Sequence, residues 1–284
     1  MRTRFAPSPT GPLHLGHAYS ALLAHDMAQA AGGTFLLRID DLDQSRARAE
    51  WEVQLKDDLR WLGLDWPEPC RRESEHLGEY EAALDRLWDM GLLYPCHCSR
   101  RDIREALSAP QEGAPIGPDG LIYPGTCRPS APPVGPRPSG LTLRLDMARA
   151  CSAIGEPISF QETGNGPDGK TGRIVATAQE MVETVGDVVV ARKEMGAAYH
   201  LAVVVDDAAQ GITQVVRGED LFDATRIHVL LQGLLGLPTP GYHHHRLIRD
   251  ADGKRLAKRD DARAIALYRS EGLSPKDVRR LVGL

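Results

Sequence analysis

The sequence of 284 residues lacks long apolar runs and starts without an apolar leader. The first ten residues, MRTRFAPSPT, have no hydrophobic core of the kind that a signal peptide carries. No segment approaches the roughly 20 apolar residues that a membrane span needs. We therefore expect a cytoplasmic protein with no membrane partner. The chain has only five cysteines, and because cytosolic thiols stay reduced, we expect no disulfide framework.

The sequence also lacks internal repeats, and its 28 glycines and 20 prolines are too few for a low-complexity chain. Hydrophobic residues make up 42% and charged residues 26%, as in ordinary globular proteins, and the length allows a sizeable core. The net charge of −5 does not by itself indicate a polyanion partner. Basic side chains do gather between Lys254 and Arg263, where a solvated helical face is the alternative interpretation.

Strand-like and helix-like segments alternate in the first part of the chain. Residues 2–5 and 34–39 are typical of buried strands, and residues 13–31 between them are typical of a helix. Amphipathic helices are predicted around residues 51–62 and 80–88. Because such alternation builds parallel sheets, the sequence predicts an α/β fold with a doubly wound parallel sheet.

The character of the sequence changes at residue 95, where prolines and glycines become frequent and apolar periodicity weakens. We interpret this point as the start of an inserted module. Further along, residues 201–205 fit either a strand or a buried helix, residues 212–217 a strand and residues 223–235 a helix. The chain thus returns to an α/β pattern.

A stretch of fourteen residues from Arg4 to His17, RFAPSPTGPLHLGH, combines a strand, a proline-stiffened turn and a helix start. A helix start offers backbone N–H groups and a positive dipole end to phosphates. His14 and His17 are three residues apart and so face the same way, and Gly16 allows a flat base to approach the backbone. Two solvated surface histidines are the alternative.

Cysteines gather in a second motif, Cys96-His97-Cys98 with Tyr123-Pro-Gly-Thr-Cys127. Three cysteines in a glycine- and proline-rich insert suit a structural zinc ion, which needs four ligands and can fold a module with little core. General zinc chemistry favours His97 as the fourth ligand, and reduced thiols without metal are the alternative. We interpret the two remaining cysteines as ordinary thiols: Cys70 and Cys151.

The segment His14-Leu-Gly-His17 resembles the HIGH-type signature of the glutamyl-tRNA synthetases and their relatives, which are class I enzymes. Lys254-Arg-Leu-Ala-Lys258 resembles their second signature, the KMSKS-type loop, and the two signatures occur in the family's order. The resemblance extends from Arg4 to about residue 264. It implies a Rossmann-type catalytic core that uses ATP with Mg²⁺ as substrate.

In that family the histidines and the loop lysine stabilise charge that moves onto the phosphates as pyrophosphate leaves. The resemblance therefore assigns catalysis to His14, His17 and Lys258, and ATP binding to these residues with Gly16. The loop departs from the family pattern, since Ala257 replaces a serine and Arg255 a lysine. These departures remove a hydroxyl group but keep the positive charge.

The resemblance implies L-glutamate as the amino acid. Glutamate carries two carboxylates and one ammonium group, so its site needs two cations and one anion. By resemblance, Arg4 binds the side-chain carboxylate and Arg217 the α-carboxylate, while Tyr199 adds a hydroxyl contact. Asp40 would bind the ammonium group, although relatives have the longer glutamate there and a turn with a helix cap is the alternative. The segment after Arg4 belongs to the same site: Phe5, Ala6, Pro7 and Ser8.

The resemblance also divides the chain into four segments. Residues 1–94 and 196–240 would form the two halves of the catalytic core, and residues 95–195 an inserted zinc-bearing, RNA-binding module. Residues 241–284 would hold the KMSKS-type loop and a short C-terminal helical segment. One branch of the family repeats the C-x-C and Y-x3-C pattern, and this favours Tyr123 as the fourth zinc ligand.

A full glutamyl-tRNA synthetase continues beyond the KMSKS-type loop into a helical domain that reads the anticodon, whereas this chain stops at Leu284. The resemblance therefore implies the shortened paralogues, which attach glutamate to the queuosine base in the anticodon of tRNA(Asp). We expect a monomer whose partners are that tRNA, L-glutamate and ATP. Three alternatives are a truncated synthetase that charges the 3′ end of tRNA(Glu), a small-molecule ligase of the same fold, and a non-catalytic RNA-binding paralogue. The intact histidines and Lys258 argue against the last.

Overall fold

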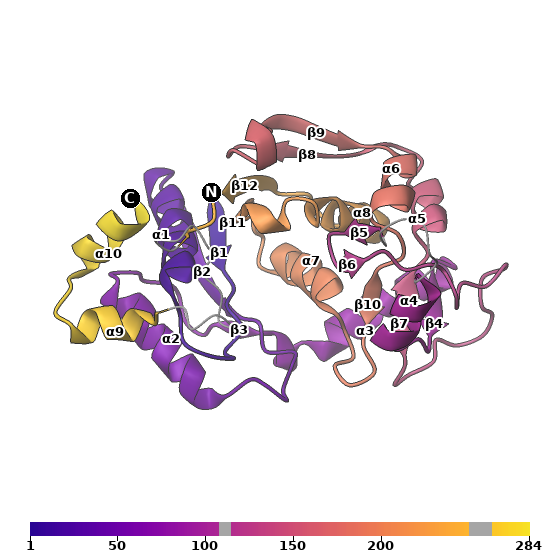
Figure 1. Cartoon of the computed structure of the whole chain (residues 1–284), viewed down its shortest axis with the longest axis horizontal. Coiled ribbons are helices and arrows are strands. Elements are labelled where there is room, and N and C mark those ends of the chain that lie inside the picture. The colour runs from indigo at the N-terminus through magenta and orange to yellow at the C-terminus, as the bar shows by residue number, and fades with distance from the viewer. Residues whose placement is uncertain (108–114, 250–262) are drawn as a thin grey trace.

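The computed structural model describes residues 1–107, 115–249 and 263–284. The N-terminal strands and the C-terminal helices lie together at one end of its long axis, and the middle of the chain forms the other end (Figure 1). The predicted loop residues fall outside the described ranges: Lys254, Arg255, Ala257 and Lys258.

Three parallel strands form one sheet in the order β1-β2-β3. They are β1 (Arg2–Phe5), β2 (Thr34–Ile39) and β3 (Arg71–Arg72), and helix α1 (Leu15–Ala30) connects the first two. Both predicted strands are confirmed at their predicted bounds. Most buried residues of α1 are alanines, so the helix can pack close to the strands.

A second sheet contains β11 (Gln214–Gly218), β12 (Gly241–His245) and β8 (Ile158–Glu162), paired in parallel. Strand β9 (Gly172–Ala176) pairs antiparallel with β8 at the edge. The predicted strand at 212–217 is confirmed with slightly shifted bounds. Strand β8 lies within the range predicted for the inserted module, and its partner β12 lies within the range predicted for the loop and the C-terminal helical segment.

The two sheets meet at β1 and β11, where the backbone N–H of Thr213 donates to the carbonyl of Arg2 at 3.0 Å. The combined strand order is therefore β3-β2-β1-β11-β12-β8-β9. From β1 the next strands in sequence lie on one side, whereas from β11 the next strand lies on the other side. In α/β folds such a switch point leaves a crevice beyond the carboxyl ends of the strands, where ligands bind.

Four helices pack around these strands: α2 (Ala49–Trp61), α3 (Leu77–Asp89), α7 (Tyr199–Ala209) and α8 (Thr225–Leu235). The ambiguous run at 201–205 is part of helix α7. One hydrophobic cluster joins α3, α7 and α8, and a second joins α1, β2, α2 and the C-terminal helices.

The far end of the molecule holds an antiparallel sheet of β4 (Leu93–Cys96), β7 (Thr142–Leu145) and β10 (Val189–Ala191), in the order β10-β7-β4. Shorter elements complete the described part of this region: α4 (Arg100–Ala106), β5 (Ile116–Gly117), β6 (Gly120–Leu121), α5 (Met147–Ile154) and α6 (Ala178–Thr184). Single 3-10 turns occur elsewhere: η1 (Glu73–Glu75), η2 (Pro167–Gly169) and η3 (Glu219–Leu221).

Two helices end the chain, α9 (Ile265–Ser270) and α10 (Pro275–Val282). Helix α10 packs beside α1, where Arg279 makes two hydrogen bonds to the carboxylate of Asp26, at 2.6 and 2.9 Å. Among the described residues, every helix is too short or too polar to cross a lipid bilayer.

Candidate active site

A cavity of about 1150 Å³ opens beyond the ends of β1, β2 and β11. It brings together most of the residues predicted for glutamate and ATP binding: Arg4, Phe5, Ala6, His14, Gly16, His17, Asp40, Tyr199 and Arg217. Among the predicted residues that the structure describes, two are not part of its lining. Pro7 is buried and its carbonyl accepts the N–H of Asp40 at 3.2 Å, while the side chain of Ser8 lies at the surface.

The start of α1 forms one wall of the cavity, and its two histidines cap the helix. His14 is the N-cap residue, and its side chain accepts the backbone N–H of Gly16 at 3.1 Å. The side chain of His17 accepts the backbone N–H of His14 at 3.1 Å. A Cβ atom on Gly16 would lie 3.0 Å from the His14 ring, so glycine leaves room for this arrangement.

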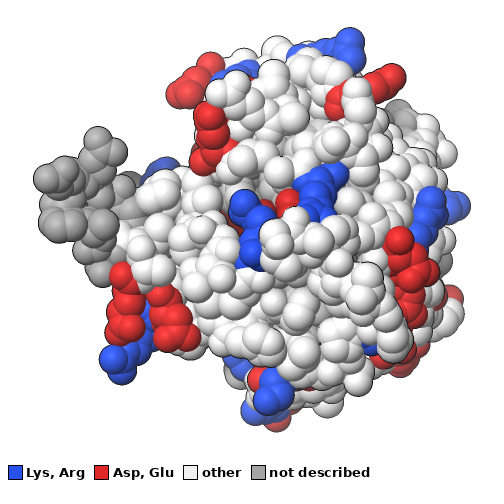
Figure 2. Space-filling view, turned by 90° about the vertical axis from the view of Figure 1, so that its right-hand side faces the viewer, with Lys and Arg blue, Asp and Glu red and all other residues white. Residues whose placement is uncertain are grey.

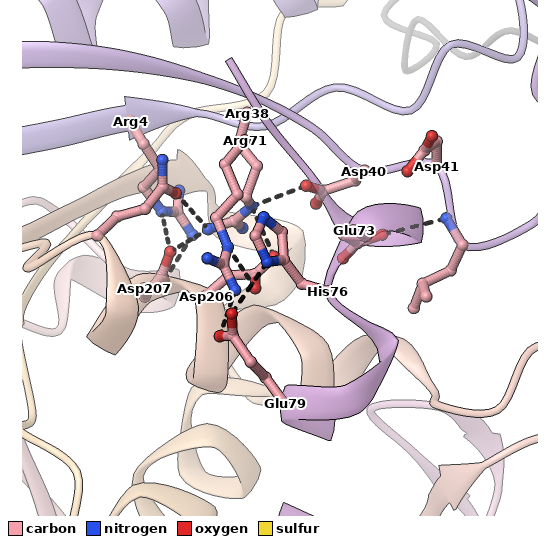
Figure 3. A network of polar contacts seen from close by, with 12 residues as sticks. Arg4, Arg38, Asp40, Asp41, Arg71, Glu73, His76, Glu79, Asp206 and Asp207 are labelled. Carbon is pink, nitrogen blue, oxygen red and sulfur yellow. Dashed lines mark hydrogen bonds and ion pairs between the residues drawn. The ribbon is translucent and has the colours of Figure 1, made fainter. Parts of the chain in front are cut away.

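Buried charges form the floor of the cavity (Figure 3). Arg4 binds the carboxylate of Asp207 with two hydrogen bonds, at 2.9 and 3.1 Å. Arg38 bridges this pair to Asp40, with hydrogen bonds of 2.6 Å to Asp207 and 2.9 Å to Asp40. Asp206 lies below Arg38, at 3.6 Å, and is bound by Arg71 at 2.9 Å.

These contacts shift the carboxylate pKa values in opposite directions. Burial would raise the pKa of Asp207, but the charges and hydrogen bonds of Arg4 and Arg38 outweigh it and lower that pKa. Burial dominates at Asp40 and raises its pKa despite the contact with Arg38. Asp207 is therefore a fixed anion, whereas an ammonium group bound at Asp40 would favour ionisation of that carboxyl.

Arg38 and Asp207 were missed by the sequence predictions. The available signal was a charged residue inside an apolar stretch, Arg38 in Phe35-Leu-Leu-Arg-Ile39 and Asp207 after a run of apolar residues. Buried arginines and aspartates need partners, so such positions mark candidates for an internal ion pair.

Arg217, at the end of β11, has a different set of partners. Its guanidinium donates to His244 at 3.2 Å, to His228 at 3.0 Å and to the hydroxyl of Thr225 at 2.6 Å. Among the residues that the structure describes, none of its hydrogen-bond partners is a carboxylate. The positive charge of Arg217 is thus buried, oriented and available to an anion.

The three predicted zinc-ligand cysteines converge at the other end of the molecule. The Sγ atoms of Cys96, Cys98 and Cys127 all lie within 4.8 Å of one another. A tetrahedral zinc ion with Zn–S bonds of about 2.3 Å would separate its sulfurs by roughly 3.8 Å. The Tyr123 hydroxyl lies 3.6 Å from Cys96 Sγ and 3.4 Å from Cys98 Sγ. The cluster could therefore hold a metal ion, with Tyr123 beside it.

The surroundings of the cluster favour a thiolate at Cys127, whereas burial raises the pKa of Cys98. The guanidinium of Arg144 donates to Cys96 Sγ at 3.3 Å and stacks on the Tyr123 ring. Burial would raise the pKa of Cys127, but hydrogen bonds from Tyr123 and from the backbone of His97 lower it to about 7. The side chain of His97 is exposed and is not part of the cluster.

The sequence profile described as "tRNA synthetases class I (E and Q), catalytic domain" matches residues 1–116 and 158–284. The chain belongs to this family and has the class I synthetase catalytic fold, with mixed α/β content and a parallel sheet. A relative from Rhodobacter capsulatus named "Glutamyl-Q tRNA(Asp) synthetase" is 61% identical over 290 residues, which span all of both chains. A relative of the same name from Nocardia farcinica is 43% identical and covers 98% of this chain and 82% of its own.

Solved structures show the same fold. A glutamate tRNA ligase from Elizabethkingia meningosepticum, in complex with its amino acid, has a TM-score of 0.75 and 25% identity over the whole of this chain. This chain spans 60% of that structure's length. Methionyl-tRNA synthetase from Mycobacterium tuberculosis, bound by methionyl-adenylate, shares the fold alone, with a TM-score of 0.59 and 13% identity.

Proposed function

We propose that this protein activates L-glutamate with ATP to form glutamyl-adenylate and transfers the glutamate to the queuosine base in the anticodon of tRNA(Asp). Full-length identity of 61% to a relative named for that activity supports the whole reaction. The observation that carries the proposal in the structure is the charge pattern of the cavity, which is complementary to glutamate.

Five buried ionisable groups on or next to the cavity floor define that pattern. Three are guanidinium groups, of Arg4, Arg38 and Arg217, and two are carboxylates, of Asp40 and Asp207. We propose that Arg217 binds the α-carboxylate, Arg4 the side-chain carboxylate and Asp40 the ammonium group, because two cations and one anion match the charged groups of the substrate.

Tyr199 begins helix α7 beside this floor and would add its hydroxyl group to the glutamate contacts. Phe5 and Ala6 line the same part of the cavity as the end of β1. Pro7 would act through its carbonyl contact with Asp40, and Ser8 would reach the substrate only at the edge of the site. We propose these five residues as the outer part of the glutamate site: Phe5, Ala6, Pro7, Ser8 and Tyr199.

The start of α1 suits the phosphates of ATP. Its backbone N–H groups and dipole attract anions, and His14 and His17 stand at that position. We propose that both histidines stabilise charge on the phosphates, that Gly16 admits the adenine, and that Mg²⁺ enters with ATP. Lys258 lies outside the described residues, and we propose the same electrostatic role for it on the strength of the sequence resemblance.

We further propose that Cys96, Cys98, Cys127 and Tyr123 hold one structural zinc ion. The sulfur separations, the nearby Arg144 and the exposed position of His97 support this ligand set. A bound zinc ion would tie together segments that have little core of their own, namely the end of β4 and the loop that carries Cys127. Residues 95–195 would then act as the inserted, RNA-contacting module, between core segments 1–94 and 196–240 and before the C-terminal segment 241–284.

Binding of tRNA would depend on local basic groups. Figure 2 shows the face at the end that holds β4, β7 and α4, where acidic and basic side chains are interspersed and several basic ones gather in a central hollow. With a net charge of −5, the protein as a whole does not attract a polyanion. Binding would therefore depend on contacts between local basic side chains and phosphates, and the affinity of such contacts falls steeply as salt rises. We propose that the protein is cytoplasmic, because its substrates tRNA and ATP are cytoplasmic. We also propose that it is a monomer, which light scattering of the purified protein tests.

One labelling experiment tests the reaction. Purified protein is given radiolabelled glutamate, ATP and either tRNA(Asp), from cells with or without queuosine, or tRNA(Glu). A ribonuclease then separates the anticodon fragment from the 3′-terminal fragment. We expect label that requires queuosine and stays in the anticodon fragment of tRNA(Asp). Label on the 3′ end of tRNA(Glu) would instead show a truncated synthetase, and the absence of any activation would indicate a non-catalytic paralogue.

A further inference from the structure

Arg217 is held by histidines that in turn bind remote carboxylates. In the shorter of two relays, Arg217 Nε donates to His244 Nε2 at 3.2 Å, so His244 must carry its ring proton on Nδ1. That nitrogen donates to the carboxylate of Glu162. Glu162 is fixed in place because it also accepts the backbone N–H groups of His244, at 2.9 Å, and Gly164, at 2.7 Å.

The longer relay leaves the other side of the guanidinium. Arg217 Nη1 donates to His228 Nδ1 at 3.0 Å, and His228 Nε2 lies 2.9 Å from His200 Nδ1. His200 Nε2 lies 2.8 Å from both carboxylate oxygens of Asp119, in the turn between β5 and β6. The donor directions are consistent along this longer relay, because His228 and His200 can each accept on Nδ1 and donate on Nε2.

Both rings that touch Arg217 are neutral. His228 and His244 are almost completely buried. Burial and the neighbouring Arg217 charge lower the pKa of His228 far below its ordinary value. Burial also lowers the pKa of His244, although Glu162 opposes it.

This arrangement orients the guanidinium group of Arg217 without neutralising its charge. A carboxylate in direct contact would fix Arg217 but would also offset part of its charge, as Asp207, shared with Arg38, does for Arg4. One imidazole ring separates Arg217 from Glu162, and two rings separate it from Asp119. The nearest ring accepts the hydrogen bond of Arg217, while the negative charge lies farther away. The free electrostatic attraction of Arg217 then remains for an incoming carboxylate.

We infer that His228 and His244 are positioning residues that hold Arg217 in a charged, unneutralised state for the α-carboxylate of the substrate. The inference rests on the proposed activation of glutamate, and it adds the specific role of the two relays. Neither histidine need touch the reacting atoms. Their loss should act on the KM for glutamate much more than on the KM for ATP.

The test measures glutamate-dependent exchange of pyrophosphate into ATP, with KM for each substrate and kcat. His228→Leu removes the acceptor, and we expect the KM for glutamate to rise about 10- to 100-fold, as for loss of a hydrogen bond to a charged group. His228→Asn keeps an acceptor at the Nδ1 position and should recover most of that loss. His228→Asp places a carboxylate against Arg217 and should raise the KM for glutamate at least as much as His228→Leu does.

His243→Leu is the matched control, because His243 is next to His244 on β12 and its side chain contacts Thr163 instead of Arg217. We expect its two KM values to be unchanged. The inference is wrong if folded His228→Leu keeps the native KM for glutamate, or if both KM values rise equally. Should His228→Leu fail to fold, equal KM values for His228→Asn and His228→Asp would overturn the inference just as well. If the native protein shows no glutamate-dependent exchange of pyrophosphate into ATP, the proposed function itself is wrong.

Discussion

His14 and His17 cap the same helix start, and each uses Nδ1 to accept a backbone N–H group, at 3.1 Å in both cases. Their rings are tilted by 31° to one another, with centroids 3.8 Å apart. Because Nδ1 is an acceptor in both, the neutral rings must carry their protons on Nε2. The fold thus sets the tautomers that allow both side chains to donate to phosphate oxygens in the cavity.

The first prediction separates this capping role from chemistry. His17→Asn retains a side-chain oxygen near the Nδ1 position but has no counterpart of Nε2–H. We expect kcat for adenylate formation to fall by about 10²- to 10³-fold, as when one transition-state donor is removed. Thermal stability should stay close to native, whereas His17→Ala should lose the same activity and also about 1 kcal/mol of stability. Native kcat in folded His17→Asn would exclude His17 from the chemistry.

The second prediction concerns Arg4, whose two hydrogen bonds to Asp207 also stabilise the floor of the glutamate site. Arg4→Ala should weaken glutamate binding by about 2–5 kcal/mol, because it removes a cation and leaves buried charge less well paired. Arg4→Lys should recover only part of this, since it keeps the charge but loses the fork. The KM for glutamate is measured beside that for ATP, which we expect to stay near native.

Arg2→Ala is the control for Arg4, because Arg2 is on the same strand and its exposed side chain donates to the carbonyl of Gln210, at 2.9 Å. We expect near-native kinetics for this variant. If Arg4→Ala activates glutamate normally, the side-chain carboxylate must bind elsewhere, and Arg38 becomes the next candidate.

Local patterns allowed part of this structure to be predicted from the sequence. Residues 34–39 are mostly apolar and follow two glycines, and residues 2–5 precede a proline-rich turn, so their strand bounds were correct. The run at 201–205 is apolar throughout, which gives no period that could distinguish a strand from the helix that forms. The motif at the start of α1 is local too, and the cavity does contain both of its histidines.

Contacts between distant segments could not be read from the sequence. Arg38 meets Asp207 across 169 positions, and His244 meets Glu162 across 82. Nothing near either residue in the sequence indicates its partner, because the pairing follows from how the two sheets and α7 pack together. The resemblance supplied the residues that we propose contact the substrate but not the groups that hold those residues in place.

The third prediction tests the metal and its fourth ligand. We expect about one zinc ion per chain by elemental analysis of native protein. Cys98→Ser should bind zinc much more weakly and unfold at a lower temperature. Tyr123→Phe keeps the ring that stacks on Arg144 but removes the hydroxyl group, so it should also weaken zinc binding if that oxygen is a ligand.

Cys151→Ala is the control, because this buried thiol lies in the main hydrophobic cluster, outside the metal cluster. Its zinc content should equal that of native protein even if its stability falls. Native zinc affinity in Tyr123→Phe would leave three cysteine ligands and remove Tyr123 from the set. Folded, active native protein without metal would refute the zinc site.

The fourth prediction is a pH dependence of stability caused by Glu73. This carboxyl is buried, with Oε2 accepting the N–H of Leu42 at 3.3 Å and Oε1 having no hydrogen-bond partner among the described residues. Burial, aided by the negative charge of Asp40, raises the pKa of Glu73 from 4.5 to about 9. At neutral pH the folded protein therefore keeps a proton that the unfolded chain releases.

The sign of the effect follows from proton linkage. Below a pH of about 4.5 Glu73 is protonated in both states and has no effect, but from there to about 9 the unfolded chain binds fewer protons, so stability falls as pH rises. Glu73→Gln removes this penalty. Urea unfolding at pH 5.5 and pH 8.5 should show the variant gaining on the native protein as pH rises, whereas exposed Glu75→Gln should show no such change. An equal difference between Glu73→Gln and native protein at both pH values would mean that Glu73 is ionised in the folded state.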